Sequence, residues 1–490
     1  MSNIKKLSKD TLIYGTGRVL KKLIGLFLLP FYTRALSPDQ YGILNTLATI
    51  SSFVIIAFGI GLGGATSRYF FIADKAKDKK KIIYTSSLIR LFSYSLPVSV
   101  LVIFAKNFSM ILFNSTKYTW AIRLSSITIL FTAFMQIQEQ IFRYYREPIK
   151  YGIINVVRSL TNPIFGILFV VILQWGVFGA TLSSMVSTFI VLSLAFFVFT
   201  KTYYIFSYSW KWAKKMIKFG FPLIFTGLLL WINGMSDRFF LLHFSNLEQI
   251  GYYSISNTFS QPILLLNQAL QMSALVFVFS MYNKEDDPKK PETKKFLTQL
   301  WHLYLSISAI ITLFISIFSY EIVSIITTEE YINGILGIPL LSFGLIFQQS
   351  YHITGNGMTL KENTKPYAWI MLIAAATNVG LNFYFVPKLG FVGASITTTI
   401  SNFTYFLVSY FWSQKYFYIK RSFIKPLLYI LISLGIAIFF PFAKLQFNID
   451  TNLFHKFIAI IIALILPFLF GMLRIEYIRN LLNKLKKKYK

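Results

Sequence analysis

The sequence lacks cysteine and contains little histidine and few acidic residues. Its 490 residues include no Cys, four His, and 18 Asp and Glu residues against 48 Lys and Arg residues. The absence of cysteine excludes disulfides, thiol catalysis and iron–sulfur clusters. The histidines are scattered without the spacing of metal ligands. We therefore expect no metal site, and nothing in the sequence calls for a cofactor.

Charged residues of either sign are also scarce. They make up 13% of the chain, whereas 55% is hydrophobic and 18% is aromatic. An ordinary soluble domain of this length carries more charge. Apolar runs of about 18 residues or more recur from end to end, each bounded by a short polar stretch. The sequence therefore predicts an all-α polytopic membrane protein.

About fourteen transmembrane helices are expected from these runs. Their predicted ranges are 12–36, 42–71, 83–105, 119–141, 151–173, 178–200, 216–242, 251–280, 297–319, 334–355, 367–387, 391–413, 426–443 and 456–473. The first helix is expected to be retained, because charged residues lie inside it and no A-x-A-like cleavage site follows it.

The net charge of +30 is distributed unevenly along the chain. With the N-terminus inside, the cytoplasmic segments hold about 34 Lys and Arg residues and the outside loops about five. This asymmetry predicts a plasma-membrane protein with both termini in the cytoplasm. Most of the positive charge then contacts anionic lipid headgroups, and a nucleic-acid partner is not expected.

Two pairs of similar segments indicate an internal repeat. The stretch LSPDQYGILN (36–45) resembles SNLEQIGYYSISN (245–257), and WGVFGATLSS (175–184) resembles LGFVGASITT (389–398). We therefore predict two pseudo-symmetric six-helix lobes around a central cavity, at residues 1–208 and 209–420, followed by two helices and a basic cytoplasmic tail at 421–490. Related lobes around a cavity are typical of transporters.

Several charged residues fall inside the predicted spans. Those of most interest are Arg18, Lys21, Lys22, Arg90, Arg158, Asp237 and Arg238, whereas the last seven helices are essentially uncharged across their cores. Each cation would cost about 2.5–3.5 kcal/mol if it faced lipid. We expect them to line an aqueous interior instead.

The cations of the first helix point to an anionic substrate. Arg18 and Lys22 are spaced i and i+4 and share one helix face. A guanidinium suits phosphate because its planar fork binds two oxygens. Snorkelling to the membrane interface is the alternative for Lys21 and Lys22, and also for Arg90 and Arg158, which lie nearer to helix ends.

Asp237 has two open interpretations. It is either an ion-pair partner of a cation on the facing lobe or a site that couples transport to H⁺ or Na⁺. Arg238 points about 100° away from it on a helix and needs a different partner. The glycine-rich stretch GIGLGG (59–64) ends a membrane helix, which favours close helix packing or a flexible point over nucleotide binding.

These segments, taken in order, resemble the Wzx-type polysaccharide flippases of the multidrug/oligosaccharidyl-lipid/polysaccharide (MOP) exporter superfamily. The similarity rests on YGTGRVLKKLIGLFLLPFYTRALSPDQYG, on Asp237-Arg238 followed by IGYYSISN, and on the GVFGA and GFVGA helix starts. The resemblance implies that this chain is a bacterial inner-membrane protein. It would move undecaprenyl-pyrophosphate-linked oligosaccharides to the outer leaflet by alternating access, for O-antigen, lipopolysaccharide or capsule synthesis. The family role carries over to Arg18, while Arg90, Arg158, Asp237 and Arg238 match in location and type. The polysaccharide polymerase and chain-length machinery are candidate partners.

Three other functions are alternatives to this one. A flippase of lipid II or another cell-wall precursor fits the same cations. A drug antiporter of the MATE type should instead favour acidic residues in its cavity. A membrane glycan polymerase or ligase needs a large outside loop with catalytic groups, and the segments 320–333 and 443–455 are short. We therefore predict a transporter without catalytic residues.

Overall fold

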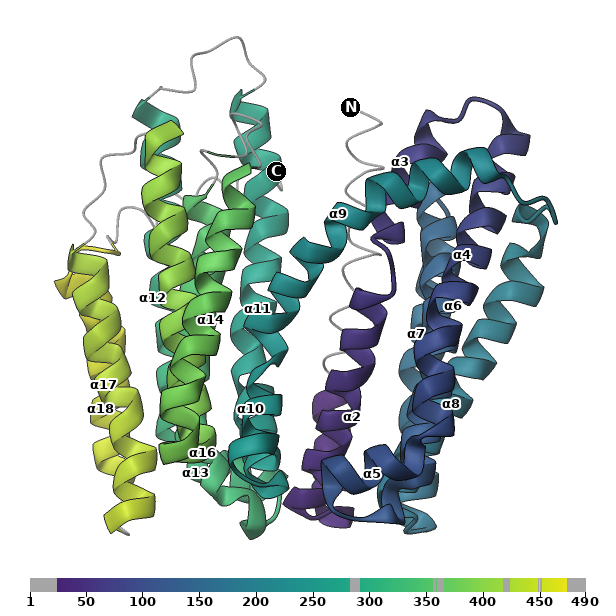
Figure 1. Ribbon diagram of the computed structural model, residues 1–490. Coiled ribbons are helices and arrows are strands. Elements are labelled where there is room, and N and C mark those ends of the chain that lie inside the picture. Colours follow the sequence, from purple (N-terminus) through teal and green to yellow (C-terminus); the bar gives the residue numbers. More distant parts are fainter. Residues whose placement is uncertain are drawn as a thin grey trace. The chain divides into compact units, whose positions relative to one another are not determined.

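The structure is a computed structural model that describes residues 24–282, 291–355, 358, 365–416, 424–447, 449 and 452–473. Within these residues the regular structure is entirely helical. Ten of the described helices are long and apolar enough to cross a membrane, and Ile24–Ala35 and Leu453–Leu469 are shorter apolar helices. The expected all-α polytopic fold is thus confirmed. The chain divides into two compact units, Met1–Gly251 and Tyr252–Lys490, which we describe separately (Figure 1).

The first unit has Ile24–Ala35 as its first described helix. Its further helices are α2 (Pro38–Ala57), α3 (Leu62–Ile72), α4 (Ala76–Ile103), α5 (Ala105–Phe113), η1 (Thr116–Tyr118), α6 (Thr119–Tyr144), α7 (Pro148–Gly166), η2 (Ile167–Ile172), α8 (Gly176–Leu194), η3 (Ala195–Thr200), η4 (Lys201–Tyr203), α9 (Trp210–Met235) and α10 (Asp237–Phe244). Helix α6 packs against α2, α4, α5, α7 and α8. It therefore forms the centre of this unit.

The second unit contains most of α11 (Leu247–Tyr282) and the elements after it. These are α12 (Pro291–Ile317), α13 (Ser319–Ile326), η5 (Glu329–Leu336), α14 (Gly337–Thr354), α16 (Lys365–Tyr416), α17 (Ile424–Phe447) and α18 (Leu453–Leu469). Helix α12 packs against α14, α17 and α18, and α14 packs along α16. Large rings such as Trp301, Tyr304 and Phe343 fill the centre of this bundle.

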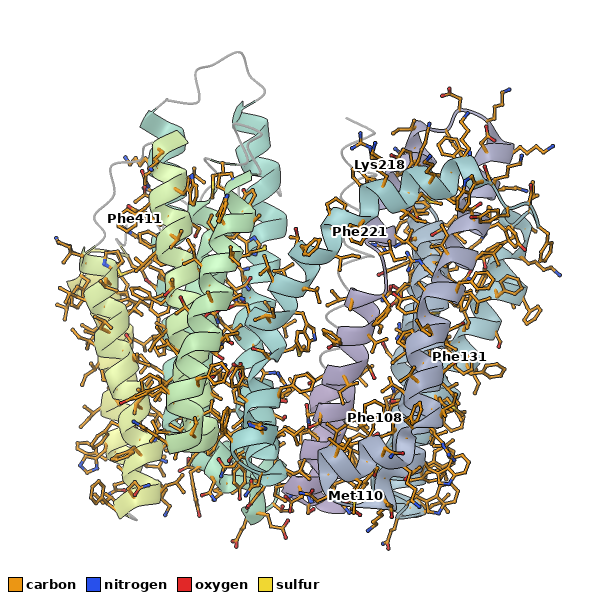
Figure 2. The ribbon with its side chains drawn as sticks, in the orientation of Figure 1. Phe108, Met110, Phe131, Lys218, Phe221 and Phe411 are labelled. Atoms are coloured by element: carbon orange, nitrogen blue, oxygen red, sulfur yellow. The ribbon has the colours of Figure 1, made fainter. Side chains whose placement is uncertain are left out.

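The outer surfaces of both units are apolar. Phe411 is 60% exposed, Phe221 56% and Met110 53% (Figure 2). A water-soluble protein rarely exposes apolar side chains in continuous bands, whereas lipid is a suitable solvent for them. The surface composition agrees with a multi-pass membrane protein.

Two of the predicted spans are broken in the structure. The expected helix 42–71 is interrupted between α2 and α3, where Ile60 and Gly61 have φ of 49° and 55°. The close approach of Gly220 on α9 explains the break, since a Cβ on Gly61 would lie 2.2 Å from the Gly220 carbonyl oxygen. The expected helix 216–242 begins earlier, as α9, and breaks at Ser236 before α10. In Figure 1, α9 runs obliquely across the end of α3.

The repeated glycines adopt the same local structure in the two units. Gly176 and Gly390 both have φ of 54°, a left-handed conformation that favours glycine. A Cβ on Gly179 would lie 2.7 Å from the Phe169 carbonyl oxygen, and one on Gly393 would lie 2.3 Å from that of Phe385. Each repeat thus turns sharply and packs its next helix against the preceding one. The lobe boundaries at 208 and 420 stay a prediction.

Candidate functional site

Arg90 is a buried cation in the middle of a membrane-crossing helix. It lies on α4 and is 2% exposed. Its two terminal nitrogens donate to the side-chain oxygens of Gln136, at 3.3 Å, and Gln140, at 3.5 Å. Both glutamines belong to α6 and are spaced i and i+4, so they share one helix face. The guanidinium fork therefore spans one turn of α6.

The charge of Arg90 is not neutralised by the side chains that the structure describes. Within the described residues Arg90 forms no salt bridge. Both of its observed hydrogen-bond acceptors are neutral amides. In the same part of the chain, Nε of Arg90 is buried without a hydrogen-bond partner. Burying a charge without a counter-charge costs several kcal/mol. Such a residue is suited to receive an anion.

Glycines allow the break between α2 and α3 to pass close to this arginine. A Cβ on Gly59 would lie 2.7 Å from the hydroxyl of Tyr94, and one on Gly63 would lie 3.4 Å from Nε2 of Gln140. An alanine at residue 59 would therefore press on Tyr94, one turn beyond Arg90 on α4, whereas one at residue 63 would come into ordinary contact with Gln140. The close-packing interpretation of residues 59–64 agrees with these contacts and with the approach of Gly220 to Gly61.

Arg158 joins the same segment of α6 through an ion pair. Its NH1 atom lies 3.2 Å from Oε1 of Glu139, and the two side chains are 24% and 19% exposed. Glu139 directly precedes Gln140, so Arg90 and Arg158 bind neighbouring residues of one helix. The Arg158 charge is balanced by a carboxylate, while that of Arg90 rests on amides. These two predicted site residues are therefore brought together.

The polar segment of α6 was not among the residues predicted from the sequence. Gln136, Gln138, Glu139 and Gln140 follow one another within an otherwise apolar helix. Polar groups inside a membrane helix usually bind one another across helices. The cluster MQIQEQ was therefore the available signal for the partners of Arg90 and Arg158.

Asp237 and Arg238 form a separate buried pair of neighbours. Asp237 is 0% and Arg238 is 5% exposed, and both lie in the first turn of α10. NH1 of Arg238 donates to the Gly234 carbonyl oxygen at 3.4 Å, and both side chains have further partners. Helix α10 packs against α2 and α9. The choice between ion pair and coupling site for Asp237 stays open, and the role of Arg238 stays a prediction.

The predicted cations of the first helix lie outside the described residues. Arg18, Lys21 and Lys22 precede Ile24, where the described part of the chain begins. Their assignment to an anionic substrate remains a prediction from the sequence.

The buried polar groups of the second unit are mostly neutral. Nδ2 of Asn382 donates to Oδ1 of Asn378 at 3.1 Å, and the Thr397 hydroxyl bonds Oδ1 of Asn382. One ion pair was not anticipated, because Lys456 in the first turn of α18 is 6% exposed and bonds Glu321 of α13. It links α18 to α13.

Comparison with known families settles the class of this membrane protein. Residues 7–283, more than half of the chain, match the family described as "Polysaccharide biosynthesis protein". The chain belongs to this family. Residues 222–384 also match the MatE family. A member of the polysaccharide biosynthesis family that also matches MatE is a transporter of the MOP superfamily, and the resemblance stated from the sequence is confirmed.

Curated relatives of this family member are similar over part of their length. The "Lsg locus putative protein 1" of Haemophilus influenzae is 24% identical over 281 residues, which cover 56% of this chain and 66% of that protein. The "Capsular polysaccharide biosynthesis protein CapF" of Staphylococcus aureus is 26% identical over 213 residues, covering 43% and 51%. The chain thus spans about half to two thirds of the length of these relatives.

Solved structures share the fold of this family member. The inward closed form of the lipid II flippase MurJ matches with a TM-score of 0.71 at 19% identity, covering 96% of this chain and 100% of that one. An inward-facing multidrug resistance transporter of the MATE family matches with a TM-score of 0.63 at 17% identity, covering 81% and 94%. At such identities the likeness establishes the fold alone.

Proposed function

We propose that this protein moves polyprenyl-pyrophosphate-linked oligosaccharide units, with undecaprenyl as the carrier, from the cytoplasmic to the outer leaflet of the bacterial plasma membrane. The family membership and the capsular relative support a role in surface polysaccharide synthesis. The observation that carries the proposal is Arg90, a cation buried within a spanning bundle and held by two neutral amides. The polysaccharide polymerase and chain-length machinery would receive the exported units.

The arrangement around Arg90 is suited to a pyrophosphate. A headgroup with this charge cannot enter about 30 Å of hydrocarbon unless other groups replace its water. Gln136 and Gln140 orient the guanidinium without neutralising it, so a phosphate oxygen competes with amides rather than with a carboxylate. A phosphate oxygen carries a negative charge that the amide oxygens lack, so its bond to the guanidinium adds a Coulomb attraction, which favours the exchange.

The other cations extend this site in the proposal. Arg158 exchanges Glu139 for the substrate, and Arg238 supplies a further contact from α10. Arg18 and Lys22 provide the cationic face of the first helix. The lobes at residues 1–208 and 209–420 would alternate access to a cavity between them, with both chain termini in the cytoplasm.

Asp237 is the candidate site for coupling transport to H⁺ or Na⁺, and an ion pair is the alternative role. Asp237 is fully buried in a first helical turn. A carboxylate at such a position changes its interactions when it binds H⁺ or Na⁺. The MATE-type fold neighbours are consistent with such coupling but establish the fold only.

The test is the fate of the carrier lipid in the source organism. Deletion of the gene should remove a surface glycan and accumulate a lipid-linked oligosaccharide on the cytoplasmic leaflet, whose mass identifies the glycan. Unchanged glycan without accumulation would overturn the proposal, and accumulation of a peptidoglycan precursor would replace it with lipid II transport.

Complementation then tests the cation. Arg90→Gln should restore transport at about one tenth of the wild-type rate or less, because a hydrogen bond to a charged group contributes about 1.5–3 kcal/mol. Arg123→Gln is the matched control, since Arg123 lies on α6 against Trp120 and the Val102 carbonyl oxygen, away from the amides that bind Arg90. Equal transport by the two variants at equal protein levels would contradict the role of Arg90.

A further inference from the structure

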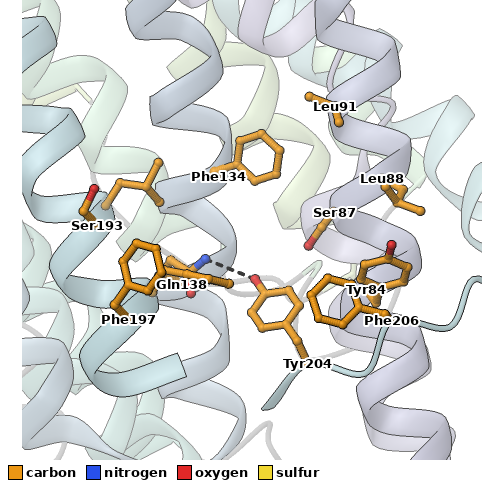
Figure 3. A pocket seen from close by; sticks show the side chains of 12 residues that line it. Tyr84, Ser87, Leu88, Leu91, Phe134, Gln138, Ser193, Phe197, Tyr204 and Phe206 are labelled. Carbon is orange, nitrogen blue, oxygen red and sulfur yellow. Dashed lines mark hydrogen bonds between the residues drawn. The ribbon is translucent and has the colours of Figure 1, made fainter. Parts of the chain in front are cut away.

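The first unit carries an apolar groove that neither Arg90 nor Arg158 lines. Its volume is about 310 Å³, and it lies between α4, α6 and the end of α8 with η3 (Figure 3). Tyr84 and Leu88 of α4, Phe134 of α6 and Phe197 of η3 line it. Phe206, from the segment after η4, closes one end with its ring 5.5 Å from that of Tyr84.

Three polar side chains at the groove, those of Ser87, Gln138 and Tyr204, form hydrogen bonds within the protein. The Ser87 hydroxyl donates to the Ile83 carbonyl oxygen at 2.9 Å, and Nε2 of Gln138 donates to the Tyr204 hydroxyl at 3.1 Å (Figure 3). The Thr200 hydroxyl donates a hydrogen bond to the side-chain oxygen of Gln138. Burial raises the pKa of Tyr204, so this hydroxyl stays neutral. The groove therefore offers a hydrocarbon surface to its occupant.

Positive charge gathers at the end of the groove where Tyr84 lies. Lys80 precedes Tyr84 by one turn of α4, and its Nζ donates to the Thr202 carbonyl oxygen at 2.7 Å. Lys201 is exposed beside Thr202. Residues 77–81 hold four lysines and one aspartate. Among the described residues, no carboxylate forms an ion pair with Lys80 or Lys201.

We propose that this groove binds one acyl chain of an anionic membrane phospholipid, with the headgroup phosphate against Lys80 and Lys201. An apolar groove that ends at two lysines without a carboxylate partner among the described residues complements a hydrocarbon chain that ends at an anion. A volume at the lower end of the range for ligand sites, about 300–1,000 Å³, suits part of one acyl chain and is too small for a polyprenyl carrier. The inference does not depend on which glycan is transported.

Native mass spectrometry of the full-length protein tests the site. The protein is mixed with phosphatidylglycerol and phosphatidylcholine of matched acyl chains, and the retained lipids are counted. We expect preferential retention of phosphatidylglycerol. Lys80→Gln and Lys201→Gln should each lower this preference about fivefold, since each lysine near an anionic surface contributes about 1 kcal/mol. Lys106→Gln and Lys117→Gln are exposed controls on α5 and η1 and should leave it unchanged.

Substitutions that fill the groove distinguish lipid binding in the groove from nonspecific lipid contact. Leu88→Trp and Leu192→Trp enter the groove from opposite walls and should each reduce retention of both lipids. Phe92→Trp is the matched control, because Phe92 is 72% exposed on α4 and does not line the groove. Equal retention of the two lipids by the wild type, or identical behaviour of the groove variants and the control, would overturn the proposal. Displacement of phosphatidylglycerol by equimolar polyprenyl phosphate would overturn it in favour of the carrier lipid.

Discussion

Gly42 offers the sharpest test of how the first unit is packed. It lies in the second turn of α2, where an added Cβ would stand 2.1 Å from the Leu247 carbonyl oxygen at the start of α11. Ordinary contact begins at 3.4 Å, so the two helix starts would have to separate by about 1.3 Å. Overpacking of this kind destabilises the folded protein by about 1–3 kcal/mol. The higher helix propensity of alanine offsets this by about 1 kcal/mol or less. Gly42→Ala should therefore lower the free energy of unfolding by about 1–2 kcal/mol.

The contact is reciprocal, which strengthens the test. A Cβ on Gly251 would lie 2.4 Å from the Pro38 carbonyl oxygen, so each repeated glycine faces the helix start that carries the other. Gly251→Ala should destabilise to a similar degree. The double variant should cost less than the sum, because both substitutions separate the same two helix turns.

Thermal unfolding of the purified protein in detergent, followed by tryptophan fluorescence, measures the effect. Gly435→Ala is the matched control, since Gly435 lies within α17 with no atom within 4 Å of an added Cβ. It should unfold at the wild-type temperature or slightly above it. If Gly42→Ala unfolds as late as Gly435→Ala, the close approach at residue 42 is wrong.

Other contacts give further expectations. Lys456→Ala should lower the free energy of unfolding by about 2 kcal/mol. Loss of a fully buried pair costs about 3–5 kcal/mol, and the smaller effect is expected here because Glu321 is 44% exposed. A double-mutant cycle with Glu321→Ala that shows no coupling would refute this. The double variant Arg158→Glu/Glu139→Arg should restore the amount of folded protein that each single substitution lowers, but it should not restore transport. Restored transport would show that the ion pair has only a structural role. A reporter fused to the C-terminal tail should be active inside the cell and one in the loop after α5 outside, and the reverse would contradict the positive-inside prediction.

The sequence by itself determined the fold class, the approximate spans and the repeated turns. Long apolar runs exceed the length needed to cross a bilayer, so their helical nature needs no tertiary information. The starts at GVFGA and GFVGA were visible as motifs because a left-handed turn and a close carbonyl contact both exclude larger residues, as Gly176 and Gly179 show. The break at Ile60 was missed, since it depends on the approach of Gly220 from a distant helix.

The partners of the charged residues were decided by the tertiary structure. Hydropathy predicted that Arg90 and Arg158 lie inside spans. It did not predict how their helices are rotated, and this rotation decides which residues of α6 the two arginines contact. Gln140 and Glu139 are adjacent in sequence, yet they bind arginines from α4 and α7 respectively. The Lys456–Glu321 pair likewise joins residues 135 positions apart. A polar side chain in a membrane helix must find a partner, but which one it finds depends on packing between helices, because no local pattern encodes it.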